Sequence, residues 1–267
     1  MRAETVTDAG RPGTPNEDWA LANETLLMAL DGATVRTETG CQHGVPWYVA
    51  KLGASLTAFA AERTDSLGVS LTLAIQFVAD QHRECDLSHP GTPSAGVGIV
   101  RLNGEHLEYL VLGDVTVIID TTDGIQVISD DRVSNTATAE RAEADRHPFG
   151  SAEKQAALLR MKHAELAVRN TEGGYWIAAA DPRAATHAIS DRLPLNSVRR
   201  VALLTDGATR AVEPFKLLDW PQLLDVLQQN GSRELINRVR AIEAADPQCT
   251  RWPRNKRSDD ATAVFAA

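Results

Sequence analysis

The sequence predicts an α+β fold in which antiparallel sheets are covered by helices. Segments of helical composition come in pairs, and they do not alternate one for one with strands as in a βαβ protein. Short β-rich runs in the middle of the chain are separated by Asn-Gly and Asp-Gly pairs, which are strong hairpin signals. No stretch of linker composition interrupts the 267 residues, so we expect one domain over residues 1–267.

The first third of the chain predicts strands followed by two helices. Residues 25–30 ("TLLMAL") form an apolar run that stops at Asp31-Gly32, which is typical of a buried strand ending in a turn. Another strand is expected directly after Glu17-Asp18. The two helices cover residues 45–64 and 65–85, and Asp65 or Ser66 caps the start of the second.

The middle of the chain predicts an antiparallel meander. Four β-rich runs follow one another, and a turn signal separates each run from the next. The runs are residues 94–102, 106–114, 115–123 and 124–130, with turns at Asn103-Gly104, Gly113-Asp114 and Asp123-Gly124.

The remainder predicts two more helix pairs and three strands. The first pair has few β-branched residues and many helix formers. The helices are residues 136–147, 152–168, 220–229 and 232–246, and the strands are residues 173–180, 197–207 and 259–267.

Charge and composition exclude several classes of function. A formal net charge of -9 argues against broad nucleic-acid binding, which requires a basic face. The basic stretch at residues 251–257 is expected to be a solvated loop. No apolar run is long enough to span a membrane, so we expect a cytoplasmic monomer without membrane or nucleic-acid partners.

The three cysteines are far apart in the sequence. Cys41, Cys85 and Cys249 show no C-x-x-C spacing, and no H-x-H or H-E-x-x-H pattern accompanies them. We therefore expect neither a zinc knuckle nor a disulfide framework.

Acidic residues gather where predicted strands end or begin. A single Asp-Gly after a strand is ordinarily a turn, because Gly accepts a positive φ and Asp bonds its own backbone. Several such carboxylates brought together repel one another unless a cation neutralises them, and Mg²⁺ and Mn²⁺ prefer such oxygen ligands. The residues are Glu17, Asp18, Asp31, Asp114, Asp206, Asp259 and Asp260.

The order of these motifs resembles the metal-dependent serine/threonine protein phosphatases of the 2C type (PPM). Asn-Glu-Asp is followed by Asp-Gly, Gly-Asp, Thr-Asp-Gly and Asp-x-Ala-Thr-x-Val, over nearly the whole chain. The resemblance implies a four-layer α/β/β/α sandwich and hydrolysis of phosphoserine and phosphothreonine on proteins. The reaction would use a water that bridges two divalent cations, Mn²⁺ or Mg²⁺.

The resemblance also implies roles for individual residues. Asp31 would bridge both ions, and Asp206 and Asp259 would hold the first. Glu17 and the carbonyl oxygen of Gly32 would hold the second, largely through water, and Asp18 would orient those waters. The sequence has no G-x-S-x-G elbow, which agrees with a mechanism that needs no protein nucleophile.

The sequence departs from the family pattern at several positions. The family's first motif reads Asp-Gly-His-Gly-Gly and here reads "DGATV"; His43 is a candidate substitute for the missing general acid, and a structural histidine is the alternative. Arg11 is the nearest candidate for the phosphate-binding arginine. Arg210 stands where relatives place an aspartate for a third ion, so Asp114 is expected only to cap its turn.

Two alternatives to a protein phosphatase stay open from the sequence. The lost histidine and the displaced arginine are compatible with a pseudophosphatase that binds a partner without turnover. A phosphatase of small phosphorylated metabolites would use the same metal chemistry with a different cleft rim.

Overall fold

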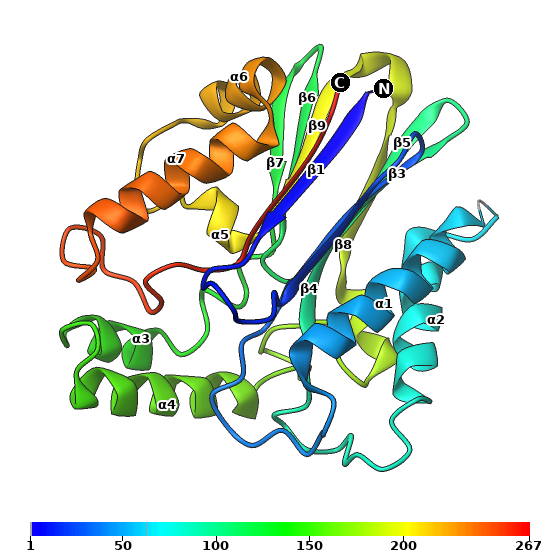
Figure 1. Cartoon of the computed structure of the whole chain (residues 1–267). Helices are drawn as coiled ribbons and strands as arrows, with labels where there is room; N and C mark the ends of the chain where they lie inside the picture. The colour runs from blue at the N-terminus through cyan, green and yellow to red at the C-terminus, as the bar shows by residue number, and fades with distance from the viewer. Residues whose placement is uncertain (1, 63) are drawn as a thin grey trace.

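Two antiparallel sheets lie face to face at the centre of the molecule (Figure 1). The computed structural model describes residues 2–62 and 64–267, and these residues form five strands in each sheet. Sheet A has the order β1 (Ala3–Asp8), β10 (Ala261–Ala266), β9 (Val198–Leu204), β6 (Thr116–Thr121) and β7 (Gly124–Ile128). Sheet B has the order β2 (Asp18–Ala22), β3 (Leu26–Gly32), β4 (Ala95–Asn103), β5 (His106–Leu112) and β8 (Ile189–Pro194).

A pair of helices covers the outer face of each sheet. α1 (Gly44–Ala61) and α2 (Leu67–Ala79) pack on sheet B, whereas α6 (Trp220–Asn230) and α7 (Ser232–Ala245) pack on sheet A (Figure 1). One apolar core lies between the sheets and one lies under each helix pair. The expected four-layer α/β/β/α sandwich is confirmed.

β3 shows how these layers are encoded. Its residues 26–30 are all buried, because both faces of the strand are covered. Met28 and Leu30 face α1 and α2, while Leu27 and Ala29 face sheet A. Successive side chains of a strand point to opposite faces, so a continuous apolar run fills two cores at once.

Ser66 caps α2, as one of the two sequence alternatives predicted. Its side chain accepts a hydrogen bond from the backbone N–H of Val69 at 3.3 Å. This bond satisfies one of the donors that the first turn of a helix leaves unpaired.

The predicted meander is wrong at Gly113-Asp114. β4 pairs with β5 and β6 pairs with β7, but β5 and β6 belong to different sheets. Gly113 adopts a φ of 80°, and the chain crosses there from sheet B to sheet A. A turn signal in the sequence marks where a strand ends, and it does not say which layer receives the next strand.

The strand predicted at residues 173–180 is also wrong. This segment makes only isolated bridges, one of them between Ala95 and Ala178. The side chain of Asn170 bonds both the N–H and the carbonyl of Ile177, at 2.8 and 3.1 Å, and so takes the place of a strand partner. The sequence prediction missed β1 and β8, which lie at an edge of each sheet.

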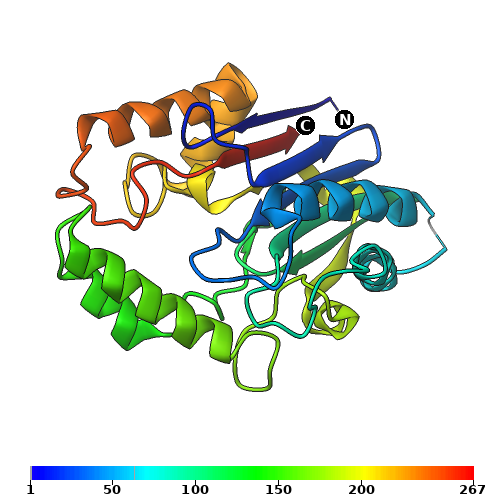
Figure 2. The same cartoon turned by 60° about the horizontal axis from the view of Figure 1, so that its bottom comes forward.

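A helical hairpin lies at one end of the sandwich, apart from both outer helix layers (Figure 2). It consists of α3 (Thr138–Asp145) and α4 (Ala152–Ala167), which share a small apolar core. The short elements η1 (Pro182–His187), η2 (Leu195–Ser197) and α5 (Asp206–Thr209) complete the description. Among the described residues, no helix combines the length and apolar character needed to cross a bilayer.

Candidate active site

The tetrapeptide "DGAT" occurs twice in the sequence, at residues 31–34 and 206–209. The two copies lie close together at one end of the two sheets. The first begins at the end of β3 in sheet B, and the second follows β9 in sheet A. The backbone N–H of Asp206 donates a hydrogen bond to Oδ2 of Asp31 at 3.1 Å. Each sheet therefore delivers one carboxylate to the same place.

The glycine of each copy lets a second acidic segment approach closely. A Cβ atom on Gly32 would lie 2.3 Å from the carbonyl oxygen of Glu17, and one on Gly207 would lie 2.0 Å from that of Asp260. Real Cβ atoms do not come this close to backbone oxygen, so only glycine fits at either position. The segment at Gly32 therefore packs against Glu17, and the segment at Gly207 packs against Asp260.

Asp18 is buried where the two sheets meet. Its Oδ2 accepts hydrogen bonds from the hydroxyl groups of Thr205 at 2.8 Å and Thr262 at 2.7 Å. Burial raises the pKa of Asp18 to about 8 in spite of these bonds. A buried carboxylate that is charged only at high pH indicates a site where positive charge is missing.

The neighbouring carboxylates show the same shortage of positive charge. Desolvation and the charge of Asp206 raise the pKa of Asp31 well above its ordinary value. Asp206 lies at the opening of the site, where desolvation and the charge of Asp259 raise its pKa to about 7. The pKa of Asp114 is also raised, and desolvation is the largest cause. This donor set of hard oxygens with uncompensated charge fits a divalent cation.

Asp259 differs because it already has two cationic partners. Lys256 Nζ lies 2.5 Å from its Oδ1, and Arg210 Nη2 lies 3.1 Å from its Oδ2. Asp259 therefore has positive charge beside it in the absence of a metal ion. Arg210 is buried and also pairs with Glu243 on α7 at 2.6 Å.

Lys256 belongs to the basic stretch that was expected to be a solvated loop. That expectation is wrong, because Arg254 is buried against Asp246 at 2.8 Å and Lys256 reaches into the acidic site. Desolvation lowers the pKa of Lys256, but the nearby carboxylates, Asp259 and Asp206 first among them, outweigh it and raise the pKa.

Asp260 anchors the loop between β1 and β2. Its two oxygens accept hydrogen bonds from the backbone N–H groups of Gly10 and Glu17, both at 2.7 Å. The side chain of Glu17 accepts a hydrogen bond from Thr34, which in turn accepts one from Lys256. Desolvation raises the pKa of Glu17 as well.

An open cleft of about 410 Å³ lies beside these carboxylates. Arg11, the candidate phosphate-binding residue, lines it together with Arg36. Desolvation and the charge of Arg11 help lower the pKa of Arg36. The sequence prediction missed Arg36 and Lys256, because both stand in loops whose path only the tertiary structure sets. The other lining residues include Thr14, Glu17, Thr34, Asp259, Asp260, and Phe149 and Gln155 from the helical hairpin.

The structure does not bring His43 to the carboxylates. Within the described part of the chain, its ring contacts Cys41, Cys85, His82 and Trp47. Cys41 and Cys85 lie 44 positions apart in the sequence but side by side in the structure. The sequence prediction of neither a zinc knuckle nor a disulfide framework missed this cluster of two cysteines and two histidines; the signals were a C-x-H pair and an H-x-x-C pair.

Comparison with solved structures identifies the fold. No protein-family model matches the sequence, and neither does any curated protein. The serine/threonine phosphatase PstP/Ppp of Mycobacterium tuberculosis superimposes with a TM-score of 0.60 at 17% identity, covering 99% of this chain and 97% of that one. A PstP catalytic domain in complex with two manganese ions gives 0.58 at 17% identity, over 99% and 96%.

The PPM Ser-Thr phosphatase MsPP from Mycobacterium smegmatis, in complex with cacodylate, gives a TM-score of 0.55. Its identity is 18%, over 99% of this chain and 97% of that one. The chain thus has the α+β fold of the PPM phosphatases.

Proposed function

We propose that this chain, which has the PPM fold, is an Mn²⁺- or Mg²⁺-dependent phosphatase of phosphoserine and phosphothreonine in proteins. The observation that carries the proposal is the meeting of Asp31 and Asp206, whose pKa values are raised by desolvation and by neighbouring carboxylates. A site that holds such charge from two sheets is stabilised by a cation. The solved relative with two manganese ions supports the choice of ion.

The proposed ligands are those that the motif order implies. Asp31 would serve both ions, Asp206 and Asp259 would hold the first, and Glu17 and the Gly32 carbonyl would hold the second. Asp18 stands behind them, fixed by two threonine hydroxyls. When bound, two divalent cations lower the pKa of a water and offset phosphate charge.

Cationic side chains of the cleft would orient the phosphoryl group. Arg11 and Arg36 both line the cleft, and the planar guanidinium suits bidentate contact with phosphate oxygens. Lys256 also lines the cleft and donates a hydrogen bond to Asp259. Phe149 and Gln155 of the helical hairpin add to the wall of the open cleft, which supports a protein segment as substrate. The unpaired thiols of the described residues agree with a cytoplasmic location.

A second function, partner binding without turnover, is favoured by one observation. The ammonium group of Lys256 bonds Asp259 and Thr34, so it supplies positive charge where the first ion would bind. If this internal cation is permanent, the site needs no metal, and the cleft can only bind.

The test combines metal titration with hydrolysis. Wild type should bind Mn²⁺ in calorimetry and hydrolyse a phosphothreonine peptide only in its presence. Asp206→Ala should lose at least about 100-fold in kcat/KM, since metal ligation supplies several kcal/mol. Asp123→Ala is the matched control, because Asp123 also precedes a glycine at a strand end but lies at an exposed turn.

Equal activity of wild type and Asp206→Ala would exclude the metal assignment, and absence of hydrolysis by wild type with Mn²⁺ would exclude the phosphatase assignment. Absence of Mn²⁺ binding at millimolar concentration in wild type, together with its appearance in Lys256→Ala, would establish the binding-only function.

A further inference from the structure

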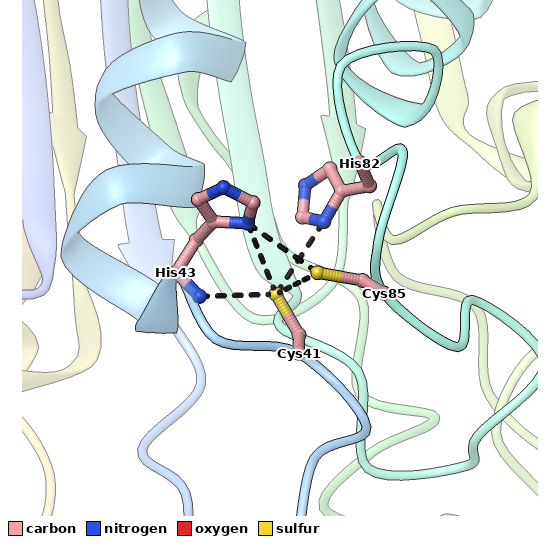
Figure 3. Close-up of side chains that lie close together, drawn as sticks. All are labelled: Cys41, His43, His82 and Cys85. Carbon is pink, nitrogen blue, oxygen red and sulfur yellow. Dashed lines mark hydrogen bonds between the residues drawn. The ribbon is translucent and has the colours of Figure 1, made fainter.

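Four sulfur and nitrogen ligands converge at the start of α1 and the end of α2. Cys41 and His43 come from the loop that leads into α1, and His82 and Cys85 come from the loop that follows α2. Figure 3 shows both imidazole rings turned toward the two sulfur atoms. All four potential ligand atoms lie within 4.8 Å of one another.

Four of the six distances between these atoms match a tetrahedron around a single ion. The two Sγ atoms are 3.5 Å apart, Cys41 Sγ lies 3.6 Å from His43 Nδ1 and 3.4 Å from His82 Nδ1. Cys85 Sγ lies 3.5 Å from His43 Nδ1. Tetrahedral zinc with ordinary bond lengths places two sulfurs about 3.8 Å apart and sulfur and nitrogen about 3.6 Å apart.

We propose that Cys41, His43, His82 and Cys85 form a structural Cys₂His₂ site for one Zn²⁺. Thiolate sulfur and imidazole nitrogen are the ligands that zinc prefers, whereas Mn²⁺ and Mg²⁺ prefer oxygen. Four protein ligands close the coordination sphere and leave no position for a substrate water. The site is therefore distinct in chemistry and in place from the carboxylates.

The surroundings of the cluster fit a shielded metal centre. Trp47 stacks on His43 with ring centroids 4.2 Å apart and meets His82 edge-on at 4.8 Å. His82 is buried. The backbone N–H of His43 points to Cys41 Sγ at 3.4 Å, an outer contact of the kind that supports a metal-bound thiolate.

A disulfide is the competing reading of the two cysteines. Their sulfurs are 3.5 Å apart, far beyond the bonded distance of about 2.05 Å. A disulfide also gives no reason for two imidazole nitrogens to face the same point.

The zinc would join the loop before α1 to the loop after α2. The first loop runs from Gly32 to α1 and carries Thr34 and Arg36 of the cleft. Two backbone bonds already link it to the second loop, from Asp86 N–H to Gly40 O and from Ala33 N–H to Ser94 O, both at 2.9 Å. The ion would fix the far end of this loop while leaving its cleft residues free to bind substrate.

The first experiment measures metal in the intact protein. After reconstitution and removal of loosely bound ions, wild type should hold about one Zn²⁺ per chain by mass spectrometry of the metal. Replacement by Co²⁺ should give a thiolate-to-cobalt charge-transfer band and intense tetrahedral visible bands. These bands report cysteine ligation and cannot arise from the carboxylates.

Variants then assign the ligands. Cys85→Ser and His82→Ala should lower zinc affinity by more than about 100-fold, since even outer-shell changes cost 10- to 100-fold. Cys249→Ser and His163→Ala are the controls, and both should keep one zinc. Asp206→Ala should also keep it, so loss of the phosphatase proposal would leave this one intact.

Three results would each overturn the site. These are a wild type without zinc and without the cobalt spectrum, a Cys85→Ser variant with unchanged zinc affinity, and a Cys41–Cys85 disulfide in freshly reduced and refolded protein. If a variant fails to fold, the cobalt spectrum of wild type still decides.

Discussion

Asp259 forms ion pairs with Lys256 and Arg210, and these two cations offset part of the negative charge of the acidic site. Asp31 and Asp206 have no such partner among the described residues, and their pKa values are raised. An ammonium group can be displaced by a dication, because Lys256 sits on a loop and has a flexible stem. Lys256 therefore competes with a metal ion for Asp259 and lowers the affinity of the site for that ion.

Replacing Lys256 should therefore change the affinity for Mn²⁺. Lys256→Met should bind Mn²⁺ up to about tenfold more tightly than wild type, because no ammonium competes for Asp259. Calorimetric titration at constant pH measures the change. Lys256→Arg keeps the charge and should stay close to wild type; weaker binding by the methionine variant would show that Lys256 assists the metal.

Asp18 should make metal-free stability depend on pH. Its folded pKa of about 8 lies above the ordinary value of 3.8, so the folded state holds a proton that the unfolded state has released. Stability from this group is complete below about pH 4 and is lost as pH rises to about 8. Without Mn²⁺ or Mg²⁺, the urea midpoint of wild type should fall between pH 6 and pH 8.

Asp18→Asn isolates this contribution. The amide keeps an oxygen for Thr205 and Thr262 and has no charge to desolvate. Between pH 6 and pH 8, the unfolding free energy of Asp18→Asn should fall by about 1 to 3 kcal/mol less than that of wild type. All histidines are unchanged, so parallel curves would show that Asp18 does not titrate there.

The loops and the helical hairpin, more than the sheets, decide what the cleft can bind. Asp260 fixes the loop that carries Arg11 and Glu17, and the hairpin contributes Phe149 and Gln155 to the wall. The aspartates were predictable from sequence, because each stands where a predicted strand ends or begins. Arg36 and Lys256 were not, because nothing in a polar loop tells which way it folds back.

Phe149 should matter for large substrates only. Phe149→Ala should raise KM for a phosphothreonine protein several-fold and leave p-nitrophenyl phosphate hydrolysis unchanged, because the ring lies on the cleft wall and is none of the proposed metal or phosphate contacts. Steady-state kinetics with both substrates measure the split. Leu159→Ala, at an exposed position on α4, is the control, and an equal effect on both substrates would argue against a docking role.

The sandwich as a whole determines whether the site exists, because each sheet supplies one half of it. Paired helices and long apolar strands made this layered architecture predictable. β1 and β8 escaped prediction because edge strands are half-covered or exposed and lack a clear apolar pattern. The crossing at Gly113 escaped it because sheet membership is decided by packing between layers.

Loosening the contact between the sheets should weaken metal binding. Leu203 is buried between the sheets, and Leu223 is equally buried between sheet A and α6. Leucine to alanine at either position should cost about 2 to 5 kcal/mol of unfolding free energy. Only Leu203→Ala should also reduce Mn²⁺ affinity, measured where both variants are folded; equal reductions would show that sheet position is not the cause.

The bond between Asp206 and Asp31 joins residues 175 positions apart, and it has a consequence for the order of assembly. Contacts of such long separation form after local hairpins and helix pairs, because closing the intervening loop costs entropy. During synthesis Asp31 cannot contact Asp206 until most of the chain has been made. Capture of a cation at this point would then be among the last events of folding, and its rate would report when the two halves of the molecule have closed on each other.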